Sequence, residues 1–409
     1  MTPSPLAPKH FPNIPTIAGV ELMTYACGIK YKDRDDMLVA RFSNETQAAA
    51  VFTTSSTASA NVLWGRTLLG HHMGSVLVVN AGNANAFNGQ YGTDTIELIT
   101  KECAALWKCR PEQVFPCATG VIGQPMPNDK ILTSLRAMAS NWKASNFEQA
   151  ADAIKTTDTF AKGSYTKTTI GKTPVHIAGI AKGSGMIAPN MATMLGYIFT
   201  DAAIEGSVLQ QLLAEAVETS FNAITVDSDT STSDSLYLFA TGKAGNSLIT
   251  HADDPALASF KIALQELMVE LAQLVVKDGE GATKFIQIDI TGATDKLAAR
   301  TIAMSIANSP LVKTAITGED ANWGRIMMAV GKAEQTICIP KISVAMGGTT
   351  IVKDGELNPN YREADVTQHM KGSNIHIAVD VGAVGQGKAT VWTCNLTHVY
   401  IDINADYRS

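Results

Sequence analysis

The segment at residues 182–202, KGSGMIAPNMATMLGYIFTDA, constrains the fold more than any other part of the sequence. It begins with small residues around Gly183 and Gly185, continues through Pro189, and then changes abruptly into an apolar, β-prone run at residues 194–200. Glycine permits backbone conformations that other residues rarely adopt, and proline fixes one dihedral angle. The pattern therefore predicts a tight bend that leads directly into a buried strand.

A hydroxyl residue, Thr193, stands at the junction between this bend and the strand. Its side chain is placed to attack the carbonyl of the small residue Ala192 from within the chain. Rearrangement to an ester and hydrolysis would leave Thr193 as a new N-terminus, whose free amine can act as the base for its own hydroxyl. An ordinary loop before a strand is the plainer interpretation, and this pattern alone does not decide between the two.

The same segment also fits a dinucleotide-binding fingerprint. Residues 183–188 match G-x-G-x-x-A, follow the apolar run at residues 175–181, and precede Asp201. However, only eight residues separate Gly185 from Met194, where the next strand begins. A crossover helix needs roughly ten or more residues, so we reject the nucleotide interpretation and expect no cofactor.

Composition describes an ordinary soluble globular protein. The 409 residues are 45% apolar and 17% charged, which suits two or three domains or two closely packed halves. A net charge of −6 without charge blocks argues against nucleic acid or an anionic membrane as partner. No apolar run reaches the ~18 residues that span a bilayer, and residues 1–15 lack a signal pattern, so we expect a cytoplasmic protein. The six cysteines and eight histidines are scattered, which predicts reduced thiols and no metal site.

Hydrophobic periodicity predicts a chain of mixed strands and helices. Strands are expected in a hairpin within residues 19–50 and at 48–54, 75–79, 175–180, 194–200, 236–241, 285–290, 342–346, 375–381, 389–395 and 399–403. Helices are expected near residues 96–106, 131–142, 147–154, 208–221 and 257–276.

Several polar or glycine-rich loops stand next to these strands. Thr119 and Gly120 are predicted to lie on a bend where a hydroxyl and a backbone N–H can form an oxyanion hole. Glu280, between two glycines, is a candidate functional carboxylate. Residues 226–235 miss the spacing of an EF-hand and are interpreted as a solvated or site-edge loop. Similar polar loops are found at residues 80–89, 156–159 and 318–325. For each of these loops, a plain structural turn remains an alternative interpretation.

Taken together, these segments resemble the ornithine acetyltransferases, also called glutamate N-acetyltransferases, of arginine biosynthesis. The resemblance covers nearly the whole chain and implies an α+β fold of the αββα type, with two sheets packed face to face and covered by helices. It also implies self-cleavage between Ala192 and Thr193 into chains 1–192 and 193–409, which assemble as a heterotetramer of two cleaved pairs. It rests on NAGNANA at 80–86, ATGVIG at 118–123, TTDT at 156–159, KGSGMIAPNMATML at 182–195, DSDTSTSD at 227–234, DGEGATK at 278–284, GEDANWGRI at 318–326 and the INADY ending.

The resemblance implies roles for individual residues as well. Thr193 looks like the nucleophile, and Thr119 and Gly120 look like the oxyanion pair. Lys182 is suited to the α-carboxylate that ornithine and glutamate share, and Glu280 is suited to an amino group. The positions that match the family's substrate contacts are Thr156, Lys182, Thr193, Glu280, Asn404 and Ser409.

The implied reaction is transfer of an acetyl group from N2-acetyl-L-ornithine to L-glutamate through an acetyl-Thr193 intermediate with ping-pong kinetics. Whether acetyl-CoA serves as a second donor is left open. Two other classes of function also remain open at this point. One is a related self-cleaving aminopeptidase or amidohydrolase, in which water accepts the acyl group. The other is an uncleaved, non-catalytic ligand-binding homologue.

Overall fold

The computed structural model describes residues 2–188, 194–383 and 385–405. Its first sheet has four strands in the order β1-β2-β4-β5. The hairpin expected in this region is present, because β1 and β2 pair antiparallel, whereas β4 and β5 run parallel. The strands are β1 (Val20–Tyr25), β2 (Met37–Phe42), β4 (Val76–Asn83) and β5 (Val114–Val121).

The second sheet contains the two strands that flank the segment at residues 189–193. Its order is β3-β9-β8-β7-β6, and β7 pairs antiparallel with β8 from Ile177–Thr200 to Lys182–Leu195. The predicted buried strand is confirmed as β8, whereas residues 189–193 of the predicted bend lie outside the described residues. The strands are β3 (Gln47–Phe52), β6 (Lys162–Ile170), β7 (Thr173–Lys182), β8 (Leu195–Thr200) and β9 (Ser235–Ala240).

These two sheets pack face to face through a core rich in aromatic side chains. Phe115 from the first sheet meets Tyr237 and Phe239 of the second edge-on, with ring centroids 5.5 Å apart in both pairs. Edge-to-face contact of this kind adds to the stabilisation that burial itself provides. Side chains alternate along each strand, so the opposite face of each sheet is left to pack against helices.

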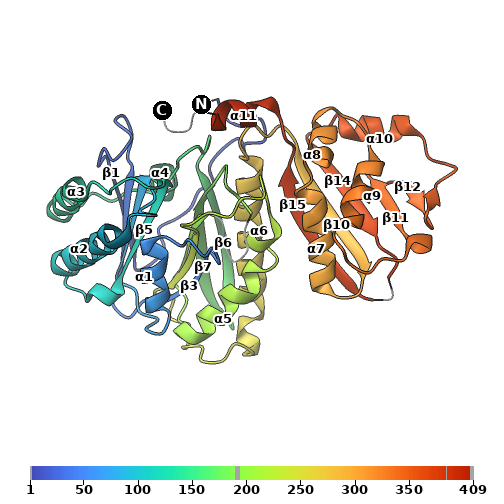
Figure 1. The fold of residues 1–409 in the computed structure, drawn as a ribbon. Helices are drawn as coiled ribbons and strands as arrows, with labels where there is room; N and C mark the ends of the chain where they lie inside the picture. Colours follow the sequence, from blue (N-terminus) through green and yellow to red (C-terminus); the bar gives the residue numbers. More distant parts are fainter. Residues whose placement is uncertain (1, 189–193, 384, 406–409) are drawn as a thin grey trace.

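Helices cover both outer faces, which completes four layers (Figure 1). Helices α2 (Gly89–Trp107) and α3 (Asn128–Ser140) pack against the first sheet. On the other side, α5 (Gly206–Val217) and α6 (Ala258–Lys277) pack against the second. The predicted αββα sandwich is therefore confirmed. The shorter helices α1 (Ala60–Leu68) and α4 (Phe147–Ala153) contribute buried side chains to the core between the two sheets. Single 3-10 turns are found at Pro111–Gln113, Phe221–Ala223, Pro255–Leu257 and Ile339–Lys341.

A third sheet, which the sequence did not separate from the other two, lies beside the sandwich. Its six strands have the order β13-β12-β11-β14-β10-β15 and a hydrophobic core of their own. Buried and half-exposed residues alternate along β10 and β14, so helices cover one face only. The strands are β10 (Phe285–Ala293), β11 (Ser343–Met346), β12 (Thr349–Lys353), β13 (Glu356–Leu357), β14 (Asn374–Asp380) and β15 (Gly387–Cys394).

The helices of this third part follow its strands closely along the chain. They are α7 (Lys296–Ala307), α8 (Pro310–Thr317), α9 (Trp323–Gly331) and α10 (Glu363–Met370), and α11 (His398–Asn404) follows the last strand. The strand predicted at residues 399–403 is wrong, because this stretch lies within α11.

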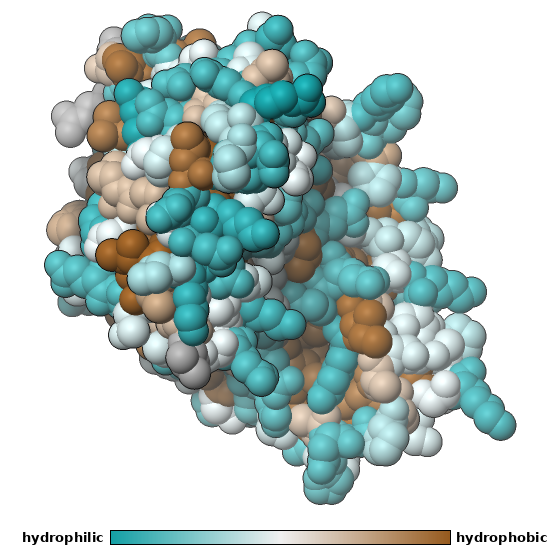
Figure 2. All heavy atoms as spheres, turned by 90° about the vertical axis from the view of Figure 1, so that its right-hand side faces the viewer, coloured by the Kyte–Doolittle hydropathy of each residue, from teal (hydrophilic) through white to brown (hydrophobic). Residues whose placement is uncertain are grey.

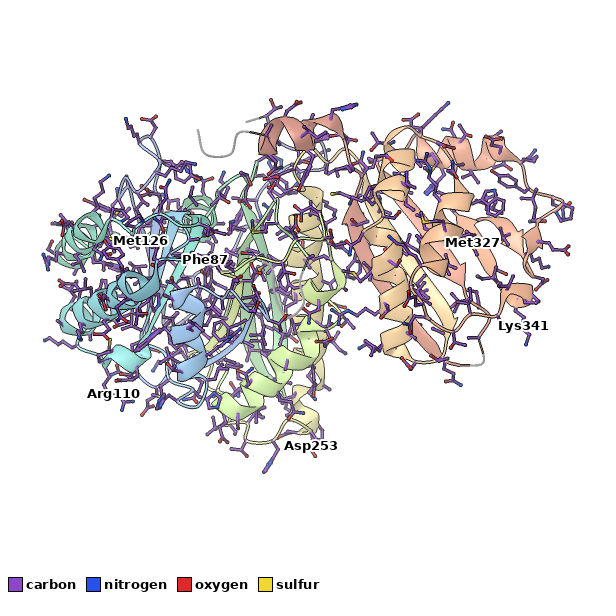
Figure 3. The ribbon with its side chains drawn as sticks, in the orientation of Figure 1. Phe87, Arg110, Met126, Asp253, Met327 and Lys341 are labelled. Atoms are coloured by element: carbon purple, nitrogen blue, oxygen red, sulfur yellow. The ribbon has the colours of Figure 1, made fainter. Side chains whose placement is uncertain are left out.

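The core between the first sheet and its helices and the core of the third sheet lie at opposite sides of the molecule. Met126 is buried in the layer of α2 and α3, whereas Met327 on α9 contacts the core of the third sheet (Figure 3). Hydrophilic residues cover most of the surface on the side of the third sheet, with hydrophobic residues in small separate groups (Figure 2). None of the helices in the described part of the chain is both long and apolar enough to cross a membrane.

Candidate active site

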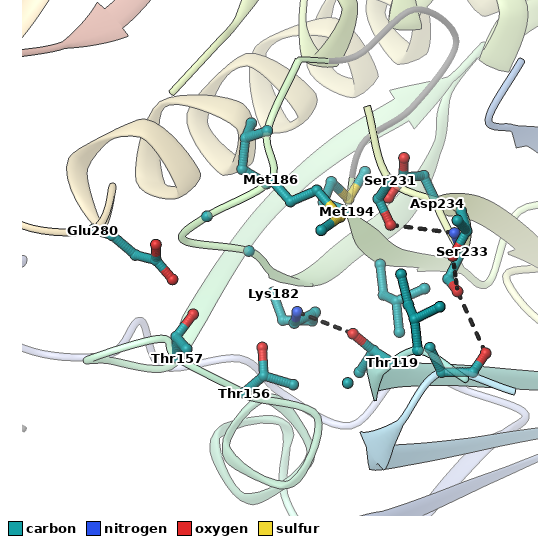
Figure 4. Close-up of a pocket in the computed structure, with 18 of the residues that line it drawn as sticks. Thr119, Thr156, Thr157, Lys182, Met186, Met194, Ser231, Ser233, Asp234 and Glu280 are labelled. Carbon is teal, nitrogen blue, oxygen red and sulfur yellow. Dashed lines mark hydrogen bonds between the residues drawn. The ribbon is translucent and has the colours of Figure 1, made fainter. Parts of the chain in front are cut away.

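One pocket brings together residues that lie far apart in the sequence (Figure 4). Its walls come from the end of β5, the end of β7, the loop after α4, the turn after α6 and the last residue of α11. Six of the predicted site residues line it: Thr119, Gly120, Thr156, Lys182, Glu280 and Asn404. Ala192, Thr193 and Ser409 lie outside the described residues.

Thr119 and Gly120 are the two residues before the last residue of strand β5, and they do not lie on a bend as predicted. The pairing of β5 with β4 shifts register beside them, at Gly82 and Asn83. Gly120 has φ +134°, and a Cβ there would collide with the backbone of Gly82. This irregular strand end therefore requires glycine, because only glycine fits both the dihedral angle and the close approach of the two strands.

Lys182 is the last residue of β7 and is buried. Its Nζ donates a hydrogen bond of 3.1 Å to Thr119 Oγ1 (Figure 4). Burial lowers the pKa of Lys182, and the carboxylate of Asp158 opposes that effect. The ammonium group is thus directed into the pocket beside the end of β5, where it can meet an anionic group of a substrate.

Glu280 lies in the turn between α6 and β10 and is also buried. Asn404 Nδ2 donates to Glu280 Oε2 at 2.6 Å, and the backbone N–H of Glu280 donates to the carbonyl of Ser184 at 3.1 Å. Burial raises the pKa of Glu280, while the bond from Asn404 opposes the rise. A Cβ at Gly185 would collide with this carboxylate, which explains a glycine at that point.

The loop at residues 226–235 forms the far wall of the pocket, so of the two interpretations the site-edge one is confirmed. Asp227 accepts hydrogen bonds from the backbone N–H groups of Met186 (2.7 Å) and Ile187 (2.8 Å) and so fixes the glycine-rich segment. Asp234 is buried in the wall, and its Oδ2 has no hydrogen-bond partner among the described residues. Burial raises the pKa of Asp234 well above its usual value.

Two other predicted loops have structural roles. In the segment at residues 80–89, Asn80 and Asn83 donate to backbone carbonyls, and Ala84 contributes to the pocket wall. In the segment at residues 318–325, Asn322 caps the N-terminus of α9. Within the described residues, no group of three His, Cys, Asp or Glu side chains is arranged to bind a metal ion.

Sequence reasoning missed several groups in and behind the pocket. In the sequence Asp234 is one residue of a polar loop, and the pairing of Lys162 with Asp158 and Asp278 is not among the predictions. The spacing of Asp158 and Lys162, four residues apart, was the one available signal. Asp278 is 116 residues from Lys162, and no local pattern reveals such a pair.

Known proteins resemble this chain over its whole length. A family model described as the ArgJ family matches residues 21–409. The chain belongs to the ArgJ family. An arginine biosynthesis bifunctional protein ArgJ from Gluconobacter oxydans is 53% identical over 406 residues, covering 99% of this chain and 95% of that protein. The protein of the same name from Agrobacterium fabrum is 49% identical over 409 residues, with 99% of both covered.

Among solved structures, the arginine biosynthesis bifunctional protein argJ from Bacillus halodurans is 39% identical to the matched part of this chain, with a TM-score of 0.49. The match covers 51% of this chain and 96% of that one. The family resemblance expected from the sequence motifs is confirmed by the family model and the full-length ArgJ relatives.

Proposed function

We propose that this ArgJ-family protein transfers the acetyl group of N2-acetyl-L-ornithine to L-glutamate, giving L-ornithine and N-acetyl-L-glutamate for arginine biosynthesis. The observation that supports this most strongly is the pocket in which Thr119, Gly120, Lys182 and Glu280 meet. Full-length relatives that are about half identical carry the name arginine biosynthesis bifunctional protein.

Thr193, released as an N-terminal residue by cleavage after Ala192, is the proposed nucleophile. Its Oγ forms a bond to the acetyl carbon while its α-amine takes the hydroxyl proton. The C–N bond of acetylornithine then breaks, and ornithine leaves with that proton on its amine. In the second half-reaction the amine of glutamate attacks the carbonyl carbon of the acetyl-Thr193 ester and gives one proton to the α-amine of Thr193. The ester C–O bond then breaks, and that proton passes to Thr193 Oγ, which restores the hydroxyl and releases N-acetylglutamate.

Thr119 and Gly120 are the proposed donors to the oxyanion that develops in both half-reactions. Because Lys182 donates to Thr119 Oγ1 at 3.1 Å, the hydroxyl hydrogen of Thr119 stays free to point at the substrate oxygen. A neighbouring cation also strengthens that hydroxyl as a donor, since hydrogen bonds in a chain polarise one another. Removing one such donor costs about 3–4 kcal/mol of transition-state stabilisation.

The remaining pocket residues are proposed to bind the substrates. Lys182 pairs with the α-carboxylate common to ornithine and glutamate, and Glu280 attracts an amino group. Asn404 keeps the Glu280 carboxylate in place through its 2.6 Å hydrogen bond. Thr156 and Ser409 complete the proposed contacts.

Three further features belong to the same proposal. Glutamate is also acetylated from acetyl-CoA, in keeping with relatives that are named bifunctional. The cleaved chains 1–192 and 193–409 assemble as a heterotetramer of two pairs. The enzyme acts in the cytoplasm, in keeping with its content of scattered cysteines.

Initial-rate kinetics and one variant test the mechanism. We expect parallel lines in double-reciprocal plots of acetylornithine against glutamate, and acetyl trapped on the chain that begins at Thr193. Thr193→Ala abolishes both cleavage and transfer, whereas Thr193→Ser keeps a hydroxyl and retains both at reduced rate. Release of acetate in place of N-acetylglutamate would instead assign a hydrolase, and a cleaved, active Thr193→Ala protein would remove Thr193 from the mechanism.

A further inference from the structure

A network of three fully buried charges lies directly behind the pocket. The Nζ of Lys162 lies 2.7 Å from Asp158 Oδ1 and 2.5 Å from Asp278 Oδ2, and the three side chains are completely shielded from solvent. None of the three lines the pocket itself. Removing charges from water costs several kcal/mol per ion, and apolar residues often stabilise such a site at least as well. This network therefore calls for an explanation other than stability.

Asp158 connects the network to two segments of the pocket wall. Its Oδ2 accepts the backbone N–H of Thr156 at 2.9 Å, and its Oδ1 accepts the backbone N–H of Gly183 at 2.6 Å. Gly183 follows Lys182 directly, so one carboxylate fixes the positions of both Thr156 and Lys182. Charged hydrogen-bond acceptors of this kind are about twice as strong as neutral ones.

Asp278 connects the same network to the turn that bears Glu280. Its carboxylate accepts the backbone N–H of Thr159 at 2.9 Å, and its carbonyl accepts Ser184 Oγ at 2.6 Å. The carbonyl of Ser184 in turn accepts the N–H of Glu280. The loop after α4, the end of β7 and the turn after α6 thus meet at Lys162.

The charge of the network also acts on Lys182 in the pocket. Asp158, Asp278 and Lys162 together carry a net charge of −1, which is opposite in sign to the Lys182 ammonium. The titratable groups that influence the pKa of Lys182 are Asp158, Lys162, Asp234 and Glu280. After burial itself, which favours the neutral amine, Asp158 has the largest influence, and it favours the ammonium form.

We propose that Asp158, Lys162 and Asp278 form a positioning network that aligns Thr156, Lys182 and Glu280, and that Asp158 supplies the counter-charge for the Lys182 ammonium. The inference rests on the proposed function, because it concerns how that enzyme binds the substrate carboxylate. The three residues act through the pocket residues and do not touch substrate.

The pH dependence of kcat/KM for acetylornithine tests the proposal. Lys182 must be protonated to pair with a carboxylate, so kcat/KM falls as pH rises through its pKa. Asp158→Asn keeps an oxygen for the N–H of Gly183 but removes the negative charge, and it moves this alkaline limb to lower pH. Above the limb, KM for acetylornithine then exceeds that of the unmodified enzyme at the same pH, because a smaller fraction of Lys182 is protonated.

A second variant predicts a shift of opposite sign. Lys162→Gln removes a positive charge that opposes protonation of Lys182, so the alkaline limb moves to higher pH. Loss of packing alone cannot move the limb in opposite directions in the two variants. Either variant is informative if the other fails to fold, which thermal denaturation and circular dichroism reveal.

Two controls complete the design. Lys182→Arg replaces the titrating amine by a group that stays charged, so the limb disappears if it belongs to Lys182. Asp289→Asn removes a hydrogen-bonded carboxylate from β10 in the third sheet, and its limb stays in place. An unshifted alkaline limb in Asp158→Asn, or shifts of the same sign in Asp158→Asn and Lys162→Gln, would contradict the proposed role of the network. An unmodified enzyme without acetyl transfer would overturn the proposed function instead.

Discussion

Gly120 shows how a single position can set the geometry of the pocket. Its φ of +134° lies in a region that residues with a side chain rarely adopt, and its Cα lies against the backbone of Gly82 on the neighbouring strand. Thr119, one residue earlier, accepts a hydrogen bond from Lys182. The direction of the Thr119 hydroxyl therefore depends on a strand end that only glycine can form.

Gly120→Ala is expected to lower kcat for acetyl transfer by about 100-fold or more, since the strand end must move and one proposed oxyanion donor is displaced. Gly123→Ala is the matched control. Gly123 also has a positive φ, +78°, but a Cβ there would contact nothing within 4 Å. Its cost is backbone strain alone, and we expect kcat to remain within a few-fold. The measurement is the steady-state kcat of both variants. Equal losses of kcat would show that backbone strain, and not the close contact with Gly82, explains the effect at Gly120.

At the same scale, the sequence predicted some of the pocket and missed the rest for identifiable reasons. Gly120 and Glu280 could be proposed from the sequence, because glycine next to a polar residue at a strand end is a local pattern. The buried Asp234 was not, because its burial arises from packing of the loop at residues 226–235 against other elements. Lys162 and Asp278 meet only after the chain has folded.

At the scale of single elements, α11 is the clearest error of prediction. Val399, Ile401 and Ile403 alternate with polar residues, which is typical of a strand, yet the segment is helical. None of the described α11 residues is fully buried, so the alternation does not report a buried face. Contacts with the turn after α6 position the helix instead, since Thr397 Oγ1 donates to the carbonyl of Gly281 at 2.8 Å.

Because α11 presents Asn404 to Glu280, we expect Asn404→Ala to weaken substrate binding and to change its pH dependence. The lost hydrogen bond stabilises the carboxylate, so the pKa of Glu280, already raised by burial, rises further. The ionised form is then reached only at higher pH, and the acid limb of kcat/KM moves to higher pH. KM should rise about fivefold for a bond worth about 1 kcal/mol.

The matched control for this prediction is Asp402→Asn, on an exposed position of the same helix. It leaves the acid limb unchanged, because Asp402 is not among the groups that influence Glu280. A limb that moves in Asp402→Asn, or that stays in place in Asn404→Ala, would show that Asn404 does not act through the Glu280 carboxylate.

At the scale of the whole molecule, the sandwich was predictable and the third sheet was not. Periodicity located most of the strands of all three sheets, including the strand that became β14 at residues 374–380. The sheet to which a strand belongs depends on pairing between distant segments, such as β10 with β15. Hydrophobic periodicity within one segment does not indicate which segment it pairs with. No linker separates the sandwich from the third sheet, because α6 of one leads to β10 of the other through seven residues.

The proposed cleavage site divides the chain in a place where the fold does not divide. Strands β3, β6 and β7 come from the first 192 residues and β8 and β9 from the rest, yet all five form one sheet. The core between the two sheets likewise draws on both parts, with Phe115 against Tyr237 and Phe239. Chains 1–192 and 193–409 are therefore expected to share their cores after cleavage and not to form independent domains.

The cleaved enzyme should consequently run as two bands under denaturing conditions and as a single species under native ones. Each half would expose one side of the strand pair β7–β8, from Ile177–Thr200 to Lys182–Leu195, together with the buried apolar side chains around it. Separation would cost about 25 cal/mol for each Å² of apolar surface exposed, in addition to the broken strand pairs. Size-exclusion chromatography of cleaved protein is the measurement, with uncleaved Thr193→Ala as the size reference. If the fragments elute apart without denaturant, the shared sheet does not hold the two chains together, and the assembly must depend on contacts elsewhere.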